Sequence, residues 1–221
     1  MVLSLMGSVF GLSNVQKIRV LVDDELSFKQ QISKVVSSSF ITIRLLARIK
    51  HFFEREQLQT LVSSLIFSVL DYCNVLYYGL SSDLVNKLQR VQNSAARLVF
   101  KTNGFDRKSS DEMFNELHWL KIRERIVFKV LLIVYKCVNN PAPEELCDMF
   151  EFVNSDRTKK LKTPRCEGKF GDRALSICGS KLWNSLPISL RLETSTEDFK
   201  KSLKTFLFTK SKEFYDIVYM K

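Results

Sequence analysis

The chain has 221 residues, which suits one large domain or two small ones and is long enough to bury a sizeable core without a disulfide or zinc staple. Apolar residues make up 45% of it, which excludes the intrinsically disordered class, and only 7 Gly and 4 Pro argue against a loop-rich all-β fold. A formal net charge of +10 favours a polyanionic partner, without choosing between nucleic acid and a membrane surface.

The predicted elements begin with a short strand at residues 17–23 (KIRVLVD), where β-branched residues lead into a run of acids. Behind Ser27 as N-cap, apolar spacings of three and four predict an amphipathic helix with an inward face of Phe28, Ile32, Val35, Val36 and Phe40. A second helix is expected to point inward Ile41, Leu45, Ile49, Phe52 and Phe53, and outward Arg44, Arg48, Lys50 and Arg55. A third helix is expected over residues 58–78.

A turn at residues 81–83 caps the next predicted helix, which is basic. Its apolar seam consists of Leu84, Leu88, Val91, Ala95, Leu98 and Val99. The polar run at 103–110 then breaks the chain. A short helix at 113–117 precedes a strong helix at 121–138, which ends at the sequence NNPAP.

The C-terminal third combines an irregular stretch with a closing helix. Residues 157–180 contain Pro164 and three glycines and show no clear period, so irregular or short extended structure is expected. The last helix is expected to start at Thr194 with Glu197 as its capping-box partner. Its apolar face, Phe199, Leu203, Phe206 and Leu207, is expected to close the domain. The elements together predict a mainly α fold.

Cysteine and histidine usage argues against metal and disulfide chemistry. The five cysteines include no CxxC pair, and neither of the two histidines has a second ligand-type side chain at a suitable spacing. We therefore predict no metal site and no cofactor. The cysteine usage also favours an intracellular chain, either nuclear or cytoplasmic. The longest apolar tracts, 58–80 and 126–138, are interrupted by charges and are expected to be buried helices, so we predict no membrane partner.

The excess positive charge lies in two short segments. Residues 84–108 hold six bases against one acid, and residues 157–173 hold seven bases against two acids. The bases predicted to contact nucleic-acid phosphates are Lys87, Arg90, Arg97 and Lys101 in the first segment, and Arg157, Lys159, Lys160, Lys162, Arg165, Lys169 and Arg173 in the second. Gln92 and Asn93 are candidates for added neutral hydrogen bonds, and Phe170 for base stacking. The alternative for each segment is a solvated helix face or a basic loop.

Six blocks of the sequence, in order, resemble the downstream end of the reverse-transcriptase polyprotein of non-LTR retrotransposons (LINEs) of the jockey and chicken-repeat type. The blocks are DELSFKQQISKV (24–35), SLIFSVLDYCNVLYYGL (64–80), LQRVQNSAARLVF (88–100), LHWLKIRERIVFKVLLIVYKCV (117–138), GDRALSICGSKLWNSLP (171–187) and FKKSLKTFLF (199–208). Three positions depart from the family pattern, namely Arg19, Gln31 and Ser180.

The resemblance implies a division of the chain. Residues 1–25 would be a remnant of the polymerase palm edge, 26–108 a helical thumb-like domain, and 109–221 a helical C-terminal region with a basic irregular insert. In this family the thumb grips the template–primer duplex. The resemblance therefore implies sequence-independent binding of RNA or RNA–DNA duplex through backbone phosphates. It also implies that the rest of a retroelement polymerase is a candidate partner.

The same resemblance implies that the catalytic palm is missing, so we expect no enzymatic activity from this chain alone and no catalytic residue. Asp23 and Asp24 imitate the metal-binding pair of a polymerase, but no third carboxylate precedes them, and Asp23 is expected to serve the turn before a helix. Asp71 is expected to cap or to pair with a base, and Trp183 to anchor the core.

Two alternatives to nucleic-acid binding stay open at this stage. The chain could be a decayed open reading frame with no selected activity. It could also be a helical protein-interaction module, with the helix at 199–208 docking on a partner.

Overall fold

The computed structural model describes residues 20–102, 108–139, 142–153, 158–165, 168 and 171–219, with side chains up to residue 209. Its α-helices are α2 (Lys29–Ile49), α3 (Arg55–Val62), α4 (Ser68–Asp71), α5 (Ser82–Val99), α6 (Ser110–Leu117), α7 (Ile122–Val138), α8 (Glu144–Cys147), α9 (Leu175–Asn184), α10 (Ile188–Arg191) and α11 (Thr196–Tyr219). Short 3₁₀ turns are η1 (Lys50–Phe52), η3 (Asn74–Tyr77) and η4 (Gly171–Arg173), and η2 (Ser63–Phe67) is a π-helical segment.

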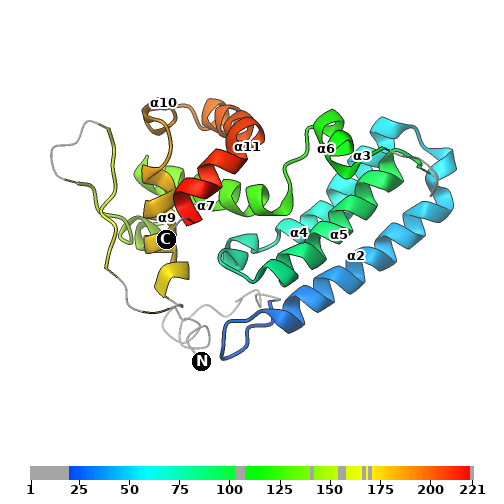
Figure 1. Ribbon diagram of the computed structural model, residues 1–221, viewed down its shortest axis with the longest axis horizontal. Coiled ribbons are helices and arrows are strands. Elements are labelled where there is room, and N and C mark those ends of the chain that lie inside the picture. Colours follow the sequence, from blue (N-terminus) through cyan, green and yellow to red (C-terminus); the bar gives the residue numbers. More distant parts are fainter. Residues whose placement is uncertain are drawn as a thin grey trace.

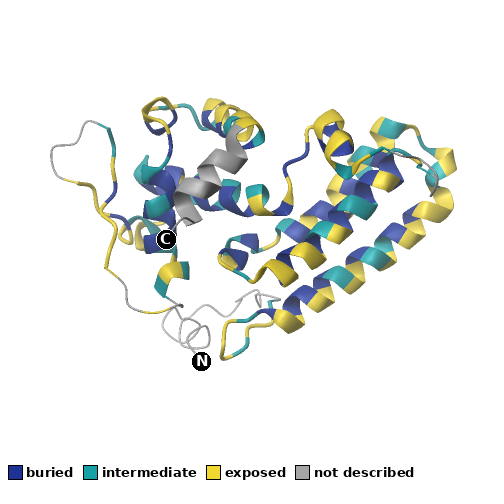
Figure 2. Ribbon diagram, in the orientation of Figure 1, coloured by how far each residue is buried: buried dark blue, intermediate teal, exposed yellow. Residues whose placement is uncertain are grey.

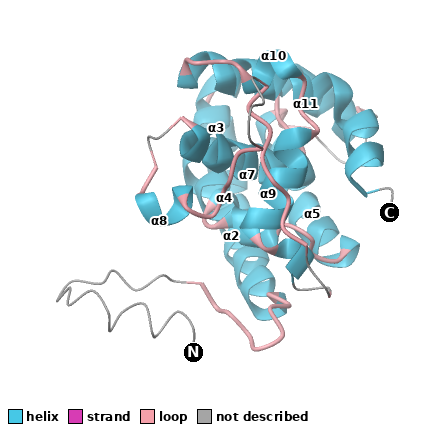
Figure 3. Cartoon of the chain, turned by 90° about the vertical axis from the view of Figure 1, so that its left-hand side faces the viewer, coloured by secondary structure: helices cyan, strands magenta, loops and turns pink. Residues whose placement is uncertain are grey.

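The fold is mainly helical, as the sequence predicts. The described residues contain no strand, only one isolated antiparallel bridge between Phe152 and Leu161 (Figure 3). The predicted strand at 17–23 is therefore wrong for residues 20–23, and its first part lies outside the described residues. Within the described part, no helix is long and apolar enough to cross a membrane.

Two groups of helices are joined through α7. In Figure 1, α2 to α6 occupy the right-hand half of the molecule and α9 to α11 the left-hand half. Helix α7 packs against α5 and η3 on one side and against α8, α9 and α11 on the other. The buried side chains of both halves form one continuous apolar cluster, so α7 is the shared wall of a single core.

Helix α5 confirms the predicted seam in full. All six seam residues, Leu84, Leu88, Val91, Ala95, Leu98 and Val99, are buried, and α2, α3, α6 and α7 pack around the helix. Figure 2 shows the buried faces of α2 and α5 turned toward the interior of the right-hand half. Most of the seam residues are three or four positions apart, which matches the α-helical repeat, so the sequence predicts this helix clearly.

Helix α2 corrects two predictions. A single helix of 21 residues replaces the two that were expected to meet at Ile41, because no residue between them breaks the helix. Ser27 is not its N-cap. Instead, the Asp23 carboxylate accepts hydrogen bonds from the backbone N–H groups of Ser27 (2.7 Å) and Phe28 (2.8 Å). The helix start is thus stabilised by an acid placed before it, as expected for Asp23.

The predicted inward face of the second helix is also wrong. Ile41, Leu45 and Ile49 of α2 and Phe52 of η1 are exposed, and Phe53 is half-buried. Helix α2 packs on α5 with its other side, through Ile32, Ile43 and Leu46 among others. The helix carries more apolar positions than its own chain covers.

The predicted third helix does not continue to residue 78. It passes through the π-helical segment η2 and ends at Asp71, and Cys73 then takes left-handed torsions with φ 54°. Hydroxyls of Thr60, Ser63, Ser64 and Ser68 each donate to the carbonyl four residues earlier. Such bonds compete with the regular ladder and favour a local distortion.

In the C-terminal half, residues 175–180, at the end of the stretch predicted to be irregular, belong to α9 (Leu175–Asn184). Gly179 lies inside this helix and does not break it. A Cβ at this position would lie 2.8 Å from Val134 Cγ2 and 3.1 Å from Phe150 Cε1. The glycine therefore allows α9 to approach α7 closely. Gly179 thus serves close helix packing rather than a turn.

Helix α11 closes the left-hand half as predicted. The Ser195 hydroxyl accepts from the backbone N–H of Asp198 at 3.3 Å, so the helix begins slightly later than Thr194. Phe199 stacks on Tyr135 of α7 with a ring separation of 4.0 Å, and Phe199, Leu203 and Leu207 are buried. This apolar face therefore packs against the rest of the chain.

Candidate nucleic-acid interface

Three of the predicted phosphate-binding residues, Lys87, Arg90 and Arg97, are exposed on α5. With a helical repeat of about 100° per residue, the three positions fall within about a quarter of the helix circumference, on the part of α5 that the buried seam leaves exposed, and Lys101 is exposed just after the helix ends. None of these four bases forms an ion pair with another residue of the described ranges. Their charge is therefore directed at solvent.

Lys101 extends this row past the end of α5. Its N–H donates to the Leu98 carbonyl at 3.1 Å, and the Thr102 N–H donates to the Arg97 carbonyl at 3.1 Å. This pair of bonds is the Schellman arrangement, and Lys101 occupies its left-handed position with φ 51°. We call Lys87, Arg90, Arg97 and Lys101 the basic face of α5.

The glutamines of α5 turn the other way. The Gln92 side chain is buried and donates to the Leu120 carbonyl at 2.7 Å, while Gln89 Oε1 accepts from the Ile122 N–H at 3.0 Å. Gln89 also donates to Gln92 and to Asn93 (2.9 Å). The predicted phosphate contact by Gln92 is therefore wrong, because its amide fixes α5 to the segment that enters α7.

The second basic segment is held to α9 by side chains that bond to its backbone. Trp183 Nε1 donates to the Lys159 carbonyl at 2.7 Å. The Asn184 amide both accepts from the Leu161 N–H (2.9 Å) and donates to the Leu161 carbonyl (2.7 Å), as a neighbouring strand would. Trp183 is fully buried, which confirms it as a core anchor, but the role of Asn184 has no signal in composition or periodicity.

The bases of this second segment have different surroundings. Lys160 and Arg165 are exposed, whereas Lys159 Nζ donates to Asn139 at 2.8 Å and Lys162 pairs with Glu151 at 3.0 Å. Arg157, Lys169 and Phe170 lie outside the described residues. Figure 1 places this segment at the left edge of the molecule and α5 in the right-hand half, so the two basic clusters do not form one continuous surface.

Arg173 lies at the contact between the two halves. Its guanidinium donates to the carbonyls of Tyr78 (3.1 Å) and Leu26 (2.9 Å) and stands over the Phe28 ring at 5.8 Å. Burial lowers the pKa of Arg173, and the negative charge of Asp23 opposes that shift. The two carbonyls and the Phe28 ring belong to the segments next to α2 and η3, so Arg173 connects the two halves of the molecule. The sequence does not indicate this role.

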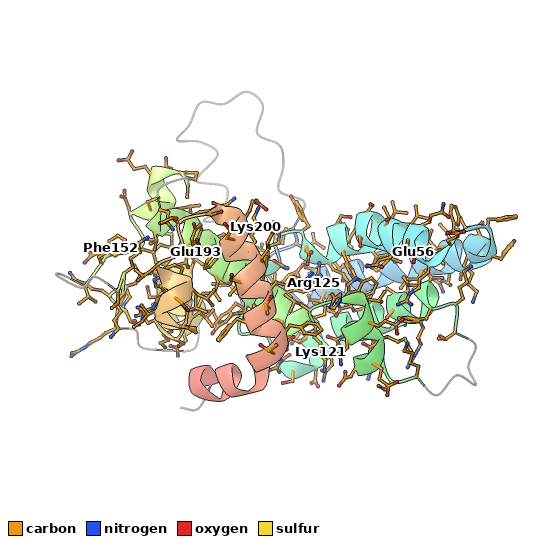
Figure 4. All side chains as sticks on the ribbon, turned by 90° about the horizontal axis from the view of Figure 1, so that it is seen from above. Glu56, Lys121, Arg125, Phe152, Glu193 and Lys200 are labelled. Carbon is orange, nitrogen blue, oxygen red and sulfur yellow. The ribbon has the colours of Figure 1, made fainter. Side chains whose placement is uncertain are left out.

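An ion pair at the centre of the molecule is confirmed. Asp71 binds the guanidinium of Arg125 from α7, with Nε at 3.0 Å from Oδ1, and also accepts from Asn74. The same guanidinium lies over the Phe67 ring at 4.4 Å. Figure 4 shows Arg125 near the middle of the molecule, between the labelled residues of the two halves. Asp71 therefore pairs with a base, as predicted.

The described residues contain no cluster of side chains arranged for metal binding. No group of three His, Cys, Asp or Glu side chains there is placed to hold a metal ion. His118 is an exposed residue that ends α6 with φ 52°. Burial raises the pKa of the Cys178 thiol to about 12 and that of Cys137 to about 11, so both are buried thiols held in the protonated form.

Comparison of the chain with protein-family models, with curated proteins and with solved structures gave no match.

Proposed function

We propose that this chain binds RNA or RNA–DNA duplex without sequence preference, through backbone phosphates that contact the basic face of α5. The observation that carries the proposal is the row of Lys87, Arg90 and Arg97 on an exposed side of α5, continued by the exposed Lys101 just past its C-terminus, while the apolar seam of the same helix is buried in the core. A rigid row of unpaired cations matches the repeating negative charge of a nucleic-acid backbone and carries no sequence information by itself.

The choice of duplex rather than another polyanion rests on the sequence resemblance to the thumb and downstream region of a non-LTR retrotransposon reverse transcriptase. On this proposal the chain derives from such a polymerase and binds without catalysing nucleotide addition. Lys160 and Arg165, exposed at the far edge, would form a secondary contact. The helix geometry supports the binding surface, and the resemblance supports the kind of ligand.

The test is a fluorescence anisotropy titration of the full chain with a labelled RNA–DNA duplex, repeated at several salt concentrations. Four phosphate contacts give a log–log slope of about −3.6, or about a 100-fold loss of affinity between about 50 and about 200 mM salt. Replacing the four bases of the basic face by Ala should abolish most of the binding and flatten this slope.

A charge-matched control separates this surface from the general positive charge of the chain. The control variant replaces four other exposed lysines by Ala, namely Lys34, Lys136, Lys201 and Lys204. It should keep nearly all of the affinity. Absence of binding at about 50 mM salt, or an equal loss in both variants, would contradict the proposal.

A further inference from the structure

Helix α2 presents an apolar stripe that the chain itself leaves uncovered. Ile41 is 52% exposed, Leu45 55% and Ile49 40%, and Phe52 of η1 is 76% exposed. The first three are four residues apart, so they form one row about 12 Å long on a single side of the helix. We call Ile41, Leu45, Ile49 and Phe52 the outer stripe of α2.

The apolar pattern of α2 is too wide for a helix with one partner. A helix at the surface of a globular protein needs one apolar stripe toward the core, and α2 already buries Ile32, Val35 and Ile43 among others on its inner side. A second row of large aliphatic side chains is typical of a helix with neighbours on two sides. The outer stripe is thus an exposed apolar patch of the kind that marks an interaction site.

The charges around the outer stripe restrict what can cover it. Helix α2 contains no acidic residue, and Arg44 and Arg48 are exposed on the flank of the stripe. Beyond Phe52, Glu54 and Glu56 are exposed at the start of α3. The rim is therefore basic along α2 and acidic at the end near η1.

We propose that the outer stripe of α2 binds an amphipathic helix of a partner protein, with acidic residues along the flank that meets Arg44 and Arg48. A single helix suits the site because a row of residues four apart is the ridge that packs into the groove of another helix. A second copy of the chain is disfavoured, because it would place two acid-free helices against each other. A uniformly anionic membrane would repel Glu54 and Glu56.

This site is separate from the proposed nucleic-acid surface, since it uses a different helix and no residue of the basic face of α5. Substitutions in the outer stripe should leave duplex affinity unchanged. The two proposals can therefore fail independently, and the duplex titration is the internal control for folding of each outer-stripe variant.

The experiment selects binders of the full chain from a displayed library of amphipathic helices of about 20 residues. The apolar positions are fixed, and the flanking positions are randomised among Glu, Gln and Lys. We expect enrichment of Glu on one flank. The selected helices should bind the Leu45→Glu variant and the Arg44→Glu/Arg48→Glu variant at least about tenfold more weakly.

Two comparisons make the result decisive. Ile188→Glu, which changes an equally exposed residue on α10, should leave helix binding unchanged. Exchanging the selected Glu residues for Lys should restore binding to the Arg44→Glu/Arg48→Glu variant. The proposal is overturned if no helix discriminates against Leu45→Glu, or if the selected flanks show no preference for Glu. It is also overturned if Leu45→Glu instead abolishes self-association in sedimentation, or binding to phosphatidylserine-rich vesicles.

Discussion

Lys101 has the left-handed backbone torsions that glycine adopts most easily, with φ 51°, while its side chain belongs to the basic face of α5. A left-handed conformation costs an L-residue roughly 1 kcal/mol. We predict that Lys101→Gly stabilises the chain by about that amount in urea unfolding, yet weakens duplex binding and makes the salt slope about 0.9 less steep.

Lys101→Ala is the control for this prediction, because it removes the same charge and keeps the Cβ. It should weaken duplex binding as much as Lys101→Gly without the gain in stability. If the glycine variant binds duplex as tightly as the parent chain, Lys101 does not contact phosphate.

Single residues also show where prediction from sequence ends. The buried positions of α5 and the pairing of Asp71 follow from spacing and from the cost of an unpaired carboxylate in an apolar helix. The role of Gln92 does not, because its hydrogen-bond partner, the Leu120 carbonyl, is 28 residues away along the chain. A polar residue on a helix cannot be assigned to solvent or to the interior until the neighbouring elements are placed.

Among the elements, the N-terminus of α2 depends on a carboxylate that lies outside the helix. Hydrogen bonds from the backbone N–H and hydroxyl of Ser27 lower the pKa of Asp23, as does the N–H of Phe28. Because the folded-state pKa is below the unfolded one, this stabilisation is present above about pH 4 and is lost as the pH falls through the folded-state value.

We predict that Asp23→Ala lowers the stability of the chain near neutral pH and flattens the dependence of stability on pH below about pH 4. Urea unfolding at a series of pH values measures both effects. Asp24→Ala is the matched control, since it removes the same charge from the next residue, which is exposed. A parallel shift of both variants at every pH would show that Asp23 does not stabilise α2 through its charge.

Helix boundaries were predicted well where apolar spacing is regular and poorly where a second contact intervenes. Helix α7 was expected at residues 121–138 and occupies Ile122–Val138, because its apolar residues contact neighbours along its whole length. Helix α9 was missed because Gly179 looks like a breaker, whereas close packing against Val134 requires it. The outward turn of Ile41 and Leu45 was missed because apolar character indicates a contact, not which molecule provides it.

At the scale of the whole molecule, Gly79 and Arg173 form a junction between the two halves. Gly79 has φ +72°, and a Cβ added to it would lie 2.7 Å from Arg173 Cγ. Gly79→Ala therefore meets both a backbone penalty and a steric one, and we predict a loss of at least about 1 kcal/mol in unfolding free energy.

A double-mutant cycle with Arg173→Ala separates these two penalties. Arg173→Ala alone loses the bonds to the Leu26 and Tyr78 carbonyls and should destabilise the chain. In the double variant the steric penalty is absent, so the combined loss should be smaller than the sum of the single losses by about 0.5 kcal/mol or more. Strict additivity would show that the two residues do not meet in solution.

Because Cys137 and Cys178 are buried on α7 and α9, and burial keeps both thiols protonated, a water-soluble alkylating reagent reaches them only when the helices that cover them open locally. The rate at which the two thiols are modified in native buffer, followed by mass spectrometry, therefore measures how often the structure around them opens. It gives the free energy of local opening at each of the two cysteines without denaturant.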